Sequence, residues 1–292
     1  LLTFASPTII TTDKSQVYVA THEIAHSWTG NQVTCQNWSN MWLNEGFTVF
    51  IERKVSAGIH GEDFSKVNAY LGNISMVSDM QTYGLDNSFS SIHPNVSGVL
   101  PDDSFSEVPY EKGFQLLYYM ETQVFNDSTA MNELITQHIN NNSQKSVVYT
   151  QFKDEFETYV NGNYDAAVAT AMIATMNWTS WVLTPGIPEI TLNFTTAGLV
   201  ESQNLADAYV SGNGTTPANA SDYNSWESNL KVVFLEQMSV NNATDLTIIK
   251  KVDADLNITG TVDPECKQRW FPLGIVKNYT DVMEPAHDFI SS

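Results

Sequence analysis

The amino-acid sequence predicts a mainly helical protein of the α+β class, organised in two domains. Segments with apolar residues at helical spacing follow one another along most of the chain, separated by loops rich in Gly, Pro, Asn and Ser. We find no strict internal repeat. With 292 residues and 42% apolar content, the chain can bury one large core or two smaller ones.

The first half of the chain begins with one predicted strand and continues in helices. Residues 2–10 read as a strand that carries a proline, which places it at a sheet edge or ends it. Two glycines mark helix ends: Gly30 follows a predicted helix over 14–28, and Gly58 follows one over 41–57. Further helices are predicted over 62–80, 110–124, 128–140 and 148–160, with loops at 31–39 and 84–106.

After the stretch TPGIPEITLNF at 184–194, the sequence changes to short helical segments joined by polar connections. Two prolines around a glycine favour a domain boundary there. We therefore predict a first domain over residues 1–192 and a second, helical domain over residues 193–292. The helices of the second domain are predicted over 201–210, 222–239, 243–253, 264–276 and 279–290.

The composition excludes two classes of partner. The formal charge is −20, from 33 acidic and 13 basic residues, and such a surface repels nucleic-acid phosphates and anionic lipid. No apolar run approaches the roughly 18 residues of a membrane-spanning helix. The chain opens on Leu1, without Met and without a basic segment before an apolar one, so we interpret it as part of a longer protein.

The number of asparagines in glycosylation sequons indicates the cellular compartment of the protein. The chain has 26 asparagines, and 12 of them open an Asn-x-Ser/Thr sequon, whereas 54 Ser and Thr among 292 residues would give about 5 by chance. The excess predicts a glycoprotein of the secretory pathway or the extracellular space. The alternative is a cytoplasmic protein from an organism with Asn-rich proteins. The two cysteines, Cys35 and Cys266, form no disulfide framework.

The stretch VATHEIAHSW at 19–28 carries the strongest chemical signal. His22 and His26 are spaced i, i+4, which places both imidazoles on one face of a helix, where they can share a metal ion. Glu23 points about 100° around the helix, outside the ligand pair but beside the metal. This is the His-Glu-x-x-His arrangement of zinc peptidases, in which the glutamate takes a proton from water.

A catalytic zinc site needs a third protein ligand and one open position. Glu45 in MWLNEGFTVF lies 19 residues after His26, early on the next predicted helix, and completes a His₂Glu set. Cys35 falls between the two helices, and we interpret it as a structural thiol because the ligand set is complete without it. The other histidines, which fit no ligand pattern, are His60, His93, His138 and His287.

Beyond the zinc motif, several longer stretches resemble a known family. HEIAHSWTGN followed by WLNEG is similar to the gluzincin metallo-aminopeptidases, the family of aminopeptidase N. VPYEKGFQLLYYME (108–121) resembles the branch of leukotriene A(4) hydrolase and aminopeptidase B, as do LLTFASPTII, NEGFTVFIERKV and WVLTPGIPEI. The resemblance covers most of residues 1–192. It implies a thermolysin-like zinc peptidase domain followed by part of an α-helical domain of HEAT or armadillo type.

The resemblance also implies roles for individual residues. His22, His26 and Glu45 bind one Zn²⁺, and Glu23 is the general base that activates water. Tyr110 matches the family tyrosine whose hydroxyl stabilises the oxyanion, as a neutral phenol beside zinc would do on physical grounds. The expected activity is a zinc aminopeptidase that hydrolyses peptides with a free N-terminus.

Other positions leave alternatives open. Asp102 matches an aspartate that assists epoxide hydrolysis in leukotriene A(4) hydrolase, but a loop aspartate is most often only solvated. Phe105 stands where that hydrolase has a tyrosine near its lipid substrate. Glu52 either orients a zinc-bound histidine or is solvated or paired with Arg53. Asn44 is a candidate for positioning the nearby ligand glutamate.

Two departures from the family pattern affect the expected activity. The family's Gly-x-Met-Glu-Asn segment, which grips the substrate amine, and the basic residues that grip the peptide carboxylate are absent from this sequence. We therefore expect these 292 residues alone to show little aminopeptidase activity against an amino-acid anilide. The alternatives are a leukotriene A(4) hydrolase-type epoxide hydrolase and a catalytically inactive scaffold that keeps the fold.

Overall fold

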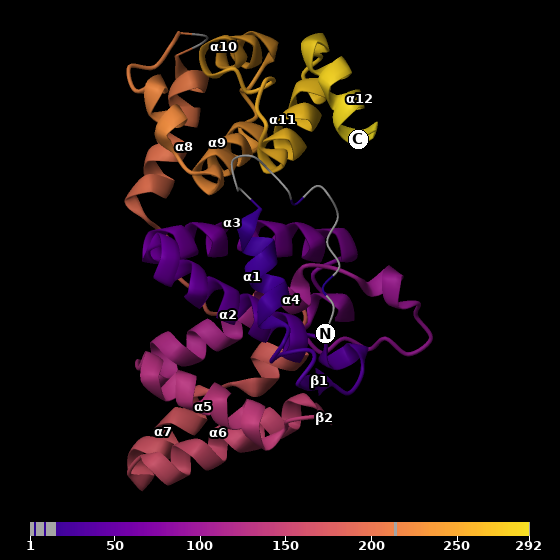
Figure 1. Ribbon diagram of the computed structural model, residues 1–292, viewed down its shortest axis with the longest axis vertical. Helices are drawn as coiled ribbons and strands as arrows, with labels where there is room; N and C mark the ends of the chain where they lie inside the picture. The colour runs from indigo at the N-terminus through magenta and orange to yellow at the C-terminus, as the bar shows by residue number, and fades with distance from the viewer. Residues whose placement is uncertain (1–2, 4–8, 10–15, 213–214, 292) are drawn as a thin grey trace. The chain divides into compact units, whose positions relative to one another are not determined.

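The computed structural model describes residues 3, 9, 16–212 and 215–291. Regular structure in these residues is nearly all helical (Figure 1), so the predicted mainly helical class is confirmed. The strand predicted at 2–10 lies outside the described residues, apart from positions 3 and 9. None of the helices in the described part of the chain is both long enough and apolar enough to span a bilayer.

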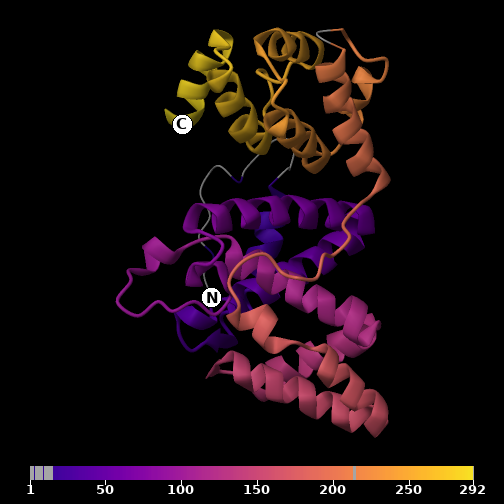
Figure 2. The same ribbon diagram turned by 180° about the vertical axis from the view of Figure 1, so that it is seen from behind.

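Contacts divide the chain into two compact units. The first includes Ala20–Ile59 and Gly72–Asn193, and the second includes His60–Leu71 and Phe194–Ser292. Residues 16–19 also group with the second unit, so segments on both sides of the predicted boundary at 192/193 contribute to it. The connection from residue 184 to residue 196 has no helix or strand and can be followed in Figure 2.

Aromatic packing holds the first unit together. Trp42, Phe47 and Phe152 are fully buried, and the rings of Phe47 and Phe152 meet edge to face at 4.9 Å. Burial of such side chains is the main stabilising contribution to a core of this kind. The helices that supply residues to this unit are α1 (Val17–Ala25), α2 (Trp42–His60), α3 (Glu62–Tyr83), α4 (Val108–Tyr119), α5 (Ser128–Asn141), α6 (Tyr149–Asn163) and α7 (Ala166–Thr175).

The loop predicted at 31–39 contains a short strand and a 3₁₀ turn. Strand β1 (Val33–Cys35) and strand β2 (Lys145–Val147) are labelled in Figure 1. They pair in parallel, with Val33 opposite Lys145. Three residues are too few to show the alternation that identifies a strand, and the partner lies far along the chain. The loop prediction was therefore wrong for residues 33–35. The 3₁₀ turn is η2 (Trp38–Asn40).

The end of α2 also differs from the prediction. The helix runs through Gly58 to His60, and Gly61 takes the left-handed conformation, with φ of +96°, that ends it. Nothing lies within 4 Å of the point where a Gly58 Cβ would stand, so packing does not require glycine there. Helix α1, by contrast, ends at Ala25, earlier than predicted.

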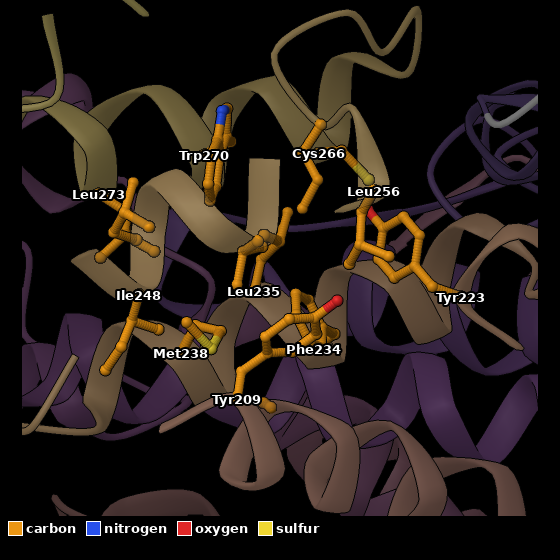
Figure 3. Packing of buried hydrophobic residues seen from close by; sticks show 14 of the residues in the cluster. Tyr209, Tyr223, Phe234, Leu235, Met238, Ile248, Leu256, Cys266, Trp270 and Leu273 are labelled. Carbon is orange, nitrogen blue, oxygen red and sulfur yellow. The ribbon is translucent and has the colours of Figure 1, made fainter. Parts of the chain in front are cut away.

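The second unit has its own core. Figure 3 shows Tyr209, Phe234 and Trp270 pointing into a common cluster from three different helices, and all three are fully buried. The helices after residue 196 are α8 (Ala197–Ser211), α9 (Ser228–Val240), α10 (Leu246–Leu256), α11 (Pro264–Val276) and α12 (Met283–Ser291), with 3₁₀ turns η7 (Ala220–Ser225) and η8 (Thr280–Val282).

Candidate metal centre

Three donor side chains converge between α1 and α2. His22 and His26 extend from α1 and the turn after it, and Glu45 lies in the first turn of α2. The Nε2 atoms of the two histidines are 3.1 Å apart, and Glu45 Oε2 lies 3.4 Å from the first and 3.2 Å from the second. The structure therefore brings together the three residues that the spacing predicted as ligands, and they are a set that could hold a metal ion.

These separations fit a zinc ion. A tetrahedral site with zinc–ligand bonds of about 2.0–2.1 Å has donor–donor edges of about 3.3 Å. In addition, Glu45 Oε2 is buried and faces the Nε2 atoms of both histidines at ion-pair distance. A buried carboxylate is costly unless a positive charge balances it, and a bound cation would supply that charge. Two imidazoles and a carboxylate are also the donors that zinc prefers.

The electrostatic field at the centre favours positive charge. Burial alone would lower the pKa of His22, but hydrogen bonds to Glu45 and Glu52 raise it to about 9. Burial likewise would raise the pKa of Glu45, yet the adjacent His22 and His26 lower it. Both shifts have the same cause: the negative carboxylates and the positive imidazoles stabilise each other.

Glu52 and Asn44 contact residues around the candidate ligands. Glu52 is 7% exposed, and its Oε2 lies 3.0 Å from His22 Nδ1, so it is placed to orient that imidazole. Arg53 pairs with Glu111 instead, at 2.7 Å. Asn44 Oδ1 accepts a hydrogen bond from the backbone N–H of Cys35, which ties strand β1 to the helix that carries the ligand glutamate.

His26 is oriented by residues that the sequence analysis did not single out. Its Nδ1 lies 2.8 Å from the backbone oxygen of Thr29 and 3.1 Å from Thr48 Oγ1. Donation from Nδ1–H to the Thr29 carbonyl leaves Nε2 unprotonated and directed at Glu45. Gly30 has φ of +127°, and a Cβ there would lie 2.8 Å from His26 Nδ1, so only glycine fits.

We expect Thr48→Val to weaken zinc binding. Thr48 is fully buried, and its hydroxyl also bonds Thr29 at 2.9 Å and 2.7 Å, so valine would leave the Thr29 hydroxyl unpaired and the His26 ring less firmly held. Loss of such a supporting residue typically costs about 10–100-fold in metal affinity. Zinc competition against a chelator measures the effect. Thr48→Ser, which keeps the hydroxyl, should bind zinc nearly as the wild type does; equal weakening in both variants would contradict the assignment.

Glu23 and Tyr110 lie next to the ligand cluster. The Tyr110 ring stacks near His22, with ring centroids 6.1 Å apart, and Tyr110 is half-buried. Burial first, and then the charges of Glu45, Glu107 and Glu23, raise the pKa of Tyr110 well above its usual value. The phenol therefore stays protonated at neutral pH and can donate a hydrogen bond.

Close contact between two helices sets the position of Tyr110 relative to Glu45. A Cβ on Gly46 would lie 2.7 Å from the Gly113 Cα, and a Cβ on Gly113 would lie 2.9 Å from the Gly46 Cα. Because neither glycine has a side chain, α2 and α4 approach backbone to backbone. One residue before Gly46 is the candidate ligand Glu45, and one helical turn before Gly113 is Tyr110.

An apolar pocket opens beside Tyr110. Asp102 is an exposed residue of the 3₁₀ turn η4 (Pro101–Ser104), and Phe105 is 63% exposed with its ring 6.1 Å from that of Tyr110. Phe105 lines the pocket, whereas Asp102 does not. The apolar lining comes mainly from the 84–106 loop and from η2, and includes Trp38, Met41, Ile92, Pro94, Val96 and Pro109.

Glu107 is a half-buried carboxyl next to the site, and no sequence pattern singles it out. It precedes α4, is half-buried, and its backbone N–H donates to Asp79 at 2.7 Å. Burial first, and then the charges of Glu111 and Asp79, raise the pKa of Glu107 to about 7, against the opposing effect of Arg53.

We expect Glu107→Gln to stabilise the fold increasingly above about pH 4.5, with the full gain reached near pH 7. Below about pH 4.5 the carboxyl is protonated in folded and unfolded chains alike. As the pH rises toward 7, the unfolded chain ionises first, so the wild-type fold loses stability, on the order of 1–3 kcal/mol, and the glutamine variant does not. Thermal unfolding at about pH 4 and pH 8 measures the difference. Asp103→Asn, at an exposed neighbour, should show no such gain; an equal gain in both would refute the burial effect.

A helix with His-Glu-x-x-His beside a second helix that supplies a glutamate is the site of the gluzincin class of zinc peptidases. This chain belongs to peptidase family M1, because the sequence model of the Peptidase family M1 domain matches residues 1–181. The family resemblance carried by the sequence motifs is thereby confirmed.

Individual relatives agree with this assignment. A leukotriene A-4 hydrolase homolog of Botryotinia fuckeliana is 33% identical over an alignment of 292 positions, which covers 99% of this chain and 44% of that protein. Leucine aminopeptidase 2 of Ajellomyces capsulatus is 32% identical over an alignment of 295 positions, which covers 100% of this chain and 46% of that protein. The structure of yeast LTA4 hydrolase with bestatin matches with a TM-score of 0.86 and 28% identity, over 95% of this chain and 47% of that one. The chain spans about half the length of the curated relatives it matches.

Proposed function

We propose that this chain forms the catalytic centre of a zinc aminopeptidase, with one Zn²⁺ held by His22, His26 and Glu45. The observation that carries the proposal is the set of donor separations, 3.1, 3.2 and 3.4 Å, beside a half-buried tyrosine. The name leucine aminopeptidase 2, carried by relatives at 30–36% identity, supports a peptide substrate with a free N-terminus.

The mechanism uses the chain's own residues as follows. A zinc ion, when bound, lowers the pKa of water toward about 7 and polarises a carbonyl. Glu23 accepts a proton from the water molecule while the water oxygen attacks the scissile carbonyl carbon. Tyr110 donates a hydrogen bond to the oxygen on which negative charge develops. Glu23 then gives the proton to the amide nitrogen, the C–N bond breaks, and the amine departs.

We expect Tyr110→Phe to lower kcat by about 10²–10³-fold, with little change in KM or zinc content, because its hydroxyl acts mainly on the transition state. Tyr119→Phe on the same helix removes a hydroxyl that bonds the Thr175 carbonyl at 3.4 Å, away from the ligands, and should leave kcat unchanged. Steady-state kinetics on an amino-acid anilide compare the two. A Tyr110→Phe enzyme with wild-type kcat would remove the tyrosine from the mechanism.

Metal analysis and a peptidase assay on the complete gene product test the function as a whole. The proposal predicts one zinc per chain after dialysis and hydrolysis of an amino-acid anilide that stops on chelation and returns with zinc. A complete protein that binds no zinc and cleaves no anilide would instead be an inactive scaffold with the peptidase fold.

Epoxide hydrolysis is the second candidate function. It is favoured by the apolar pocket beside Tyr110 and by the name of the relative from Botryotinia fuckeliana. Phe105, which lines the pocket, offers no hydroxyl to such a substrate. Offering the complete protein an amino-acid anilide and a lipid epoxide in parallel separates the two activities, and Asp102→Asn should impair only the second.

A further inference from the structure

The fold displays the sequons of this chain on its surface. Of the 12 sequon asparagines, all but Asn213 lie in the described residues, and 10 of those 11 are exposed. Of the 14 asparagines outside sequons, 8 are exposed and Asn40, Asn142 and Asn229 are buried. A glycan on a buried asparagine would be incompatible with the fold, and none of the described sequons is buried.

The exposed sequons also share a local setting. Each lies in a loop or at a helix end, where a bulky substituent disturbs no packing face. Asn126 and Asn257, for example, end η5 (Met120–Phe125) and α10 in the left-handed conformation, with φ of 49° and 51°. The ten are Asn37, Asn95, Asn126, Asn141, Asn177, Asn193, Asn219, Asn242, Asn257 and Asn278.

Asn73 is the exception, and its surroundings differ in kind. It lies in the middle of α3, is half-buried, and its side-chain oxygen accepts a hydrogen bond from Gln115 at 3.0 Å. A glycan is attached to Nδ2 of this same amide, so at Asn73 it would have to fit beside Gln115 of α4. Asn73 therefore serves as an internal negative control.

We propose that this protein is N-glycosylated on the exposed sequons and passes through the secretory pathway. Two of the sites flank the apolar pocket: Asn37 precedes Trp38, and Asn95 lies between Pro94 and Val96, all three of which line the pocket. Glycans at these positions would stand at the rim of the pocket and restrict the approach of large substrates. The proposal is independent of the zinc chemistry.

Neither thiol would be reactive in an oxidising compartment. Cys35 and Cys266 are free, and Cys266 is fully buried. Burial raises the pKa of each thiol, so little of the reactive thiolate is present at neutral pH.

The test uses protein purified from the organism that makes it, because forced secretion in a foreign host would glycosylate any accessible sequon. Peptide N-glycosidase treatment in H₂¹⁸O converts each glycosylated asparagine to labelled aspartate, which peptide mass spectrometry then locates. We expect a fall in intact mass, label at most of the ten exposed sites, and none at Asn73. No mass change, with all ten asparagines unmodified, would overturn the proposal, and so would label confined to Asn73.

Matched variants test the two sites at the pocket rim. Ser39→Ala and Ser97→Ala each remove one sequon and keep the asparagine, and each should lose one glycan when expressed in the source organism. Ser39→Thr and Ser97→Thr keep the sequons and should keep the glycans. Unchanged mass in both alanine variants would show that Asn37 and Asn95 carry no glycan and would overturn the assignment of the rim.

Discussion

The Glu23→Gln protein is expected to retain stoichiometric zinc and to lose about 10⁴-fold in kcat. Glutamine has the shape of glutamate but accepts no proton at neutral pH, and proton transfer by one positioned group typically contributes about 10²–10⁴-fold. Glu23 serves twice in the proposed cycle, as acceptor from water and as donor to the amine, which places it at the upper end of that range. Metal binding should persist, because Glu23 is outside the cluster of His22, His26 and Glu45.

Two measurements on the complete gene product decide the matter: zinc by elemental analysis, and kcat on an amino-acid anilide. Glu62→Gln, an exposed glutamate in the first turn of α3, is the charge-matched control and should behave as wild type. A zinc-loaded Glu23→Gln protein that hydrolyses at a tenth of the wild-type rate or faster would require another base. Loss of zinc in this variant would place Glu23 among the ligands.

The arrangement of the metal donors was predictable because it is encoded locally. His22 and His26 are neighbours on any helix by virtue of their spacing. Glu45 requires only that a second helix begin within the next 19 residues and turn back, and the apolar pattern of α2 indicated that helix. Geometry therefore followed from periodicity and motif together, with no long-range information.

The support around the donors was not predictable in the same way. Thr29 and Thr48 are 19 residues apart and meet at His26 only because α2 packs against the turn after α1. The sequence could not show whether Glu52 orients a histidine or is solvated or paired with Arg53, because the contact with His22 depends on how the two helices cross. The environment of Glu107 likewise depends on packing, because Asp79 of α3 lies beside it and accepts a hydrogen bond from its backbone N–H.

The errors in secondary structure have a related cause. Strand β1 is too short for a periodic signal and is defined by a partner more than a hundred residues away. Helix α7 was not predicted because its sequence, AAVATAMIAT, has almost no polar face to contrast with its apolar one. At the end of α2, two glycines three residues apart could each have ended the helix, and only backbone conformation distinguishes Gly61 from Gly58.

Removal of a direct ligand should have a larger effect on metal binding than any other change. In His26→Ala, zinc affinity should fall by more than the roughly 10–100-fold that loss of a supporting residue costs, because two protein donors replace three. The Thr29 carbonyl also loses the Nδ1–H donor that lies 2.8 Å from it. Hydrolysis should disappear with the zinc and should return only partly when zinc is added in large excess.

The control for this variant lies two residues away, in the last turn of α1. Ile24 is 62% exposed two residues before His26, and Ile24→Ala should keep both zinc and activity. Elemental analysis after dialysis, with circular dichroism to verify the fold, distinguishes loss of metal from loss of structure. If folded His26→Ala still carried one zinc per chain, the third donor would have to come from elsewhere, and the donor separations between α1 and α2 would no longer identify the metal centre.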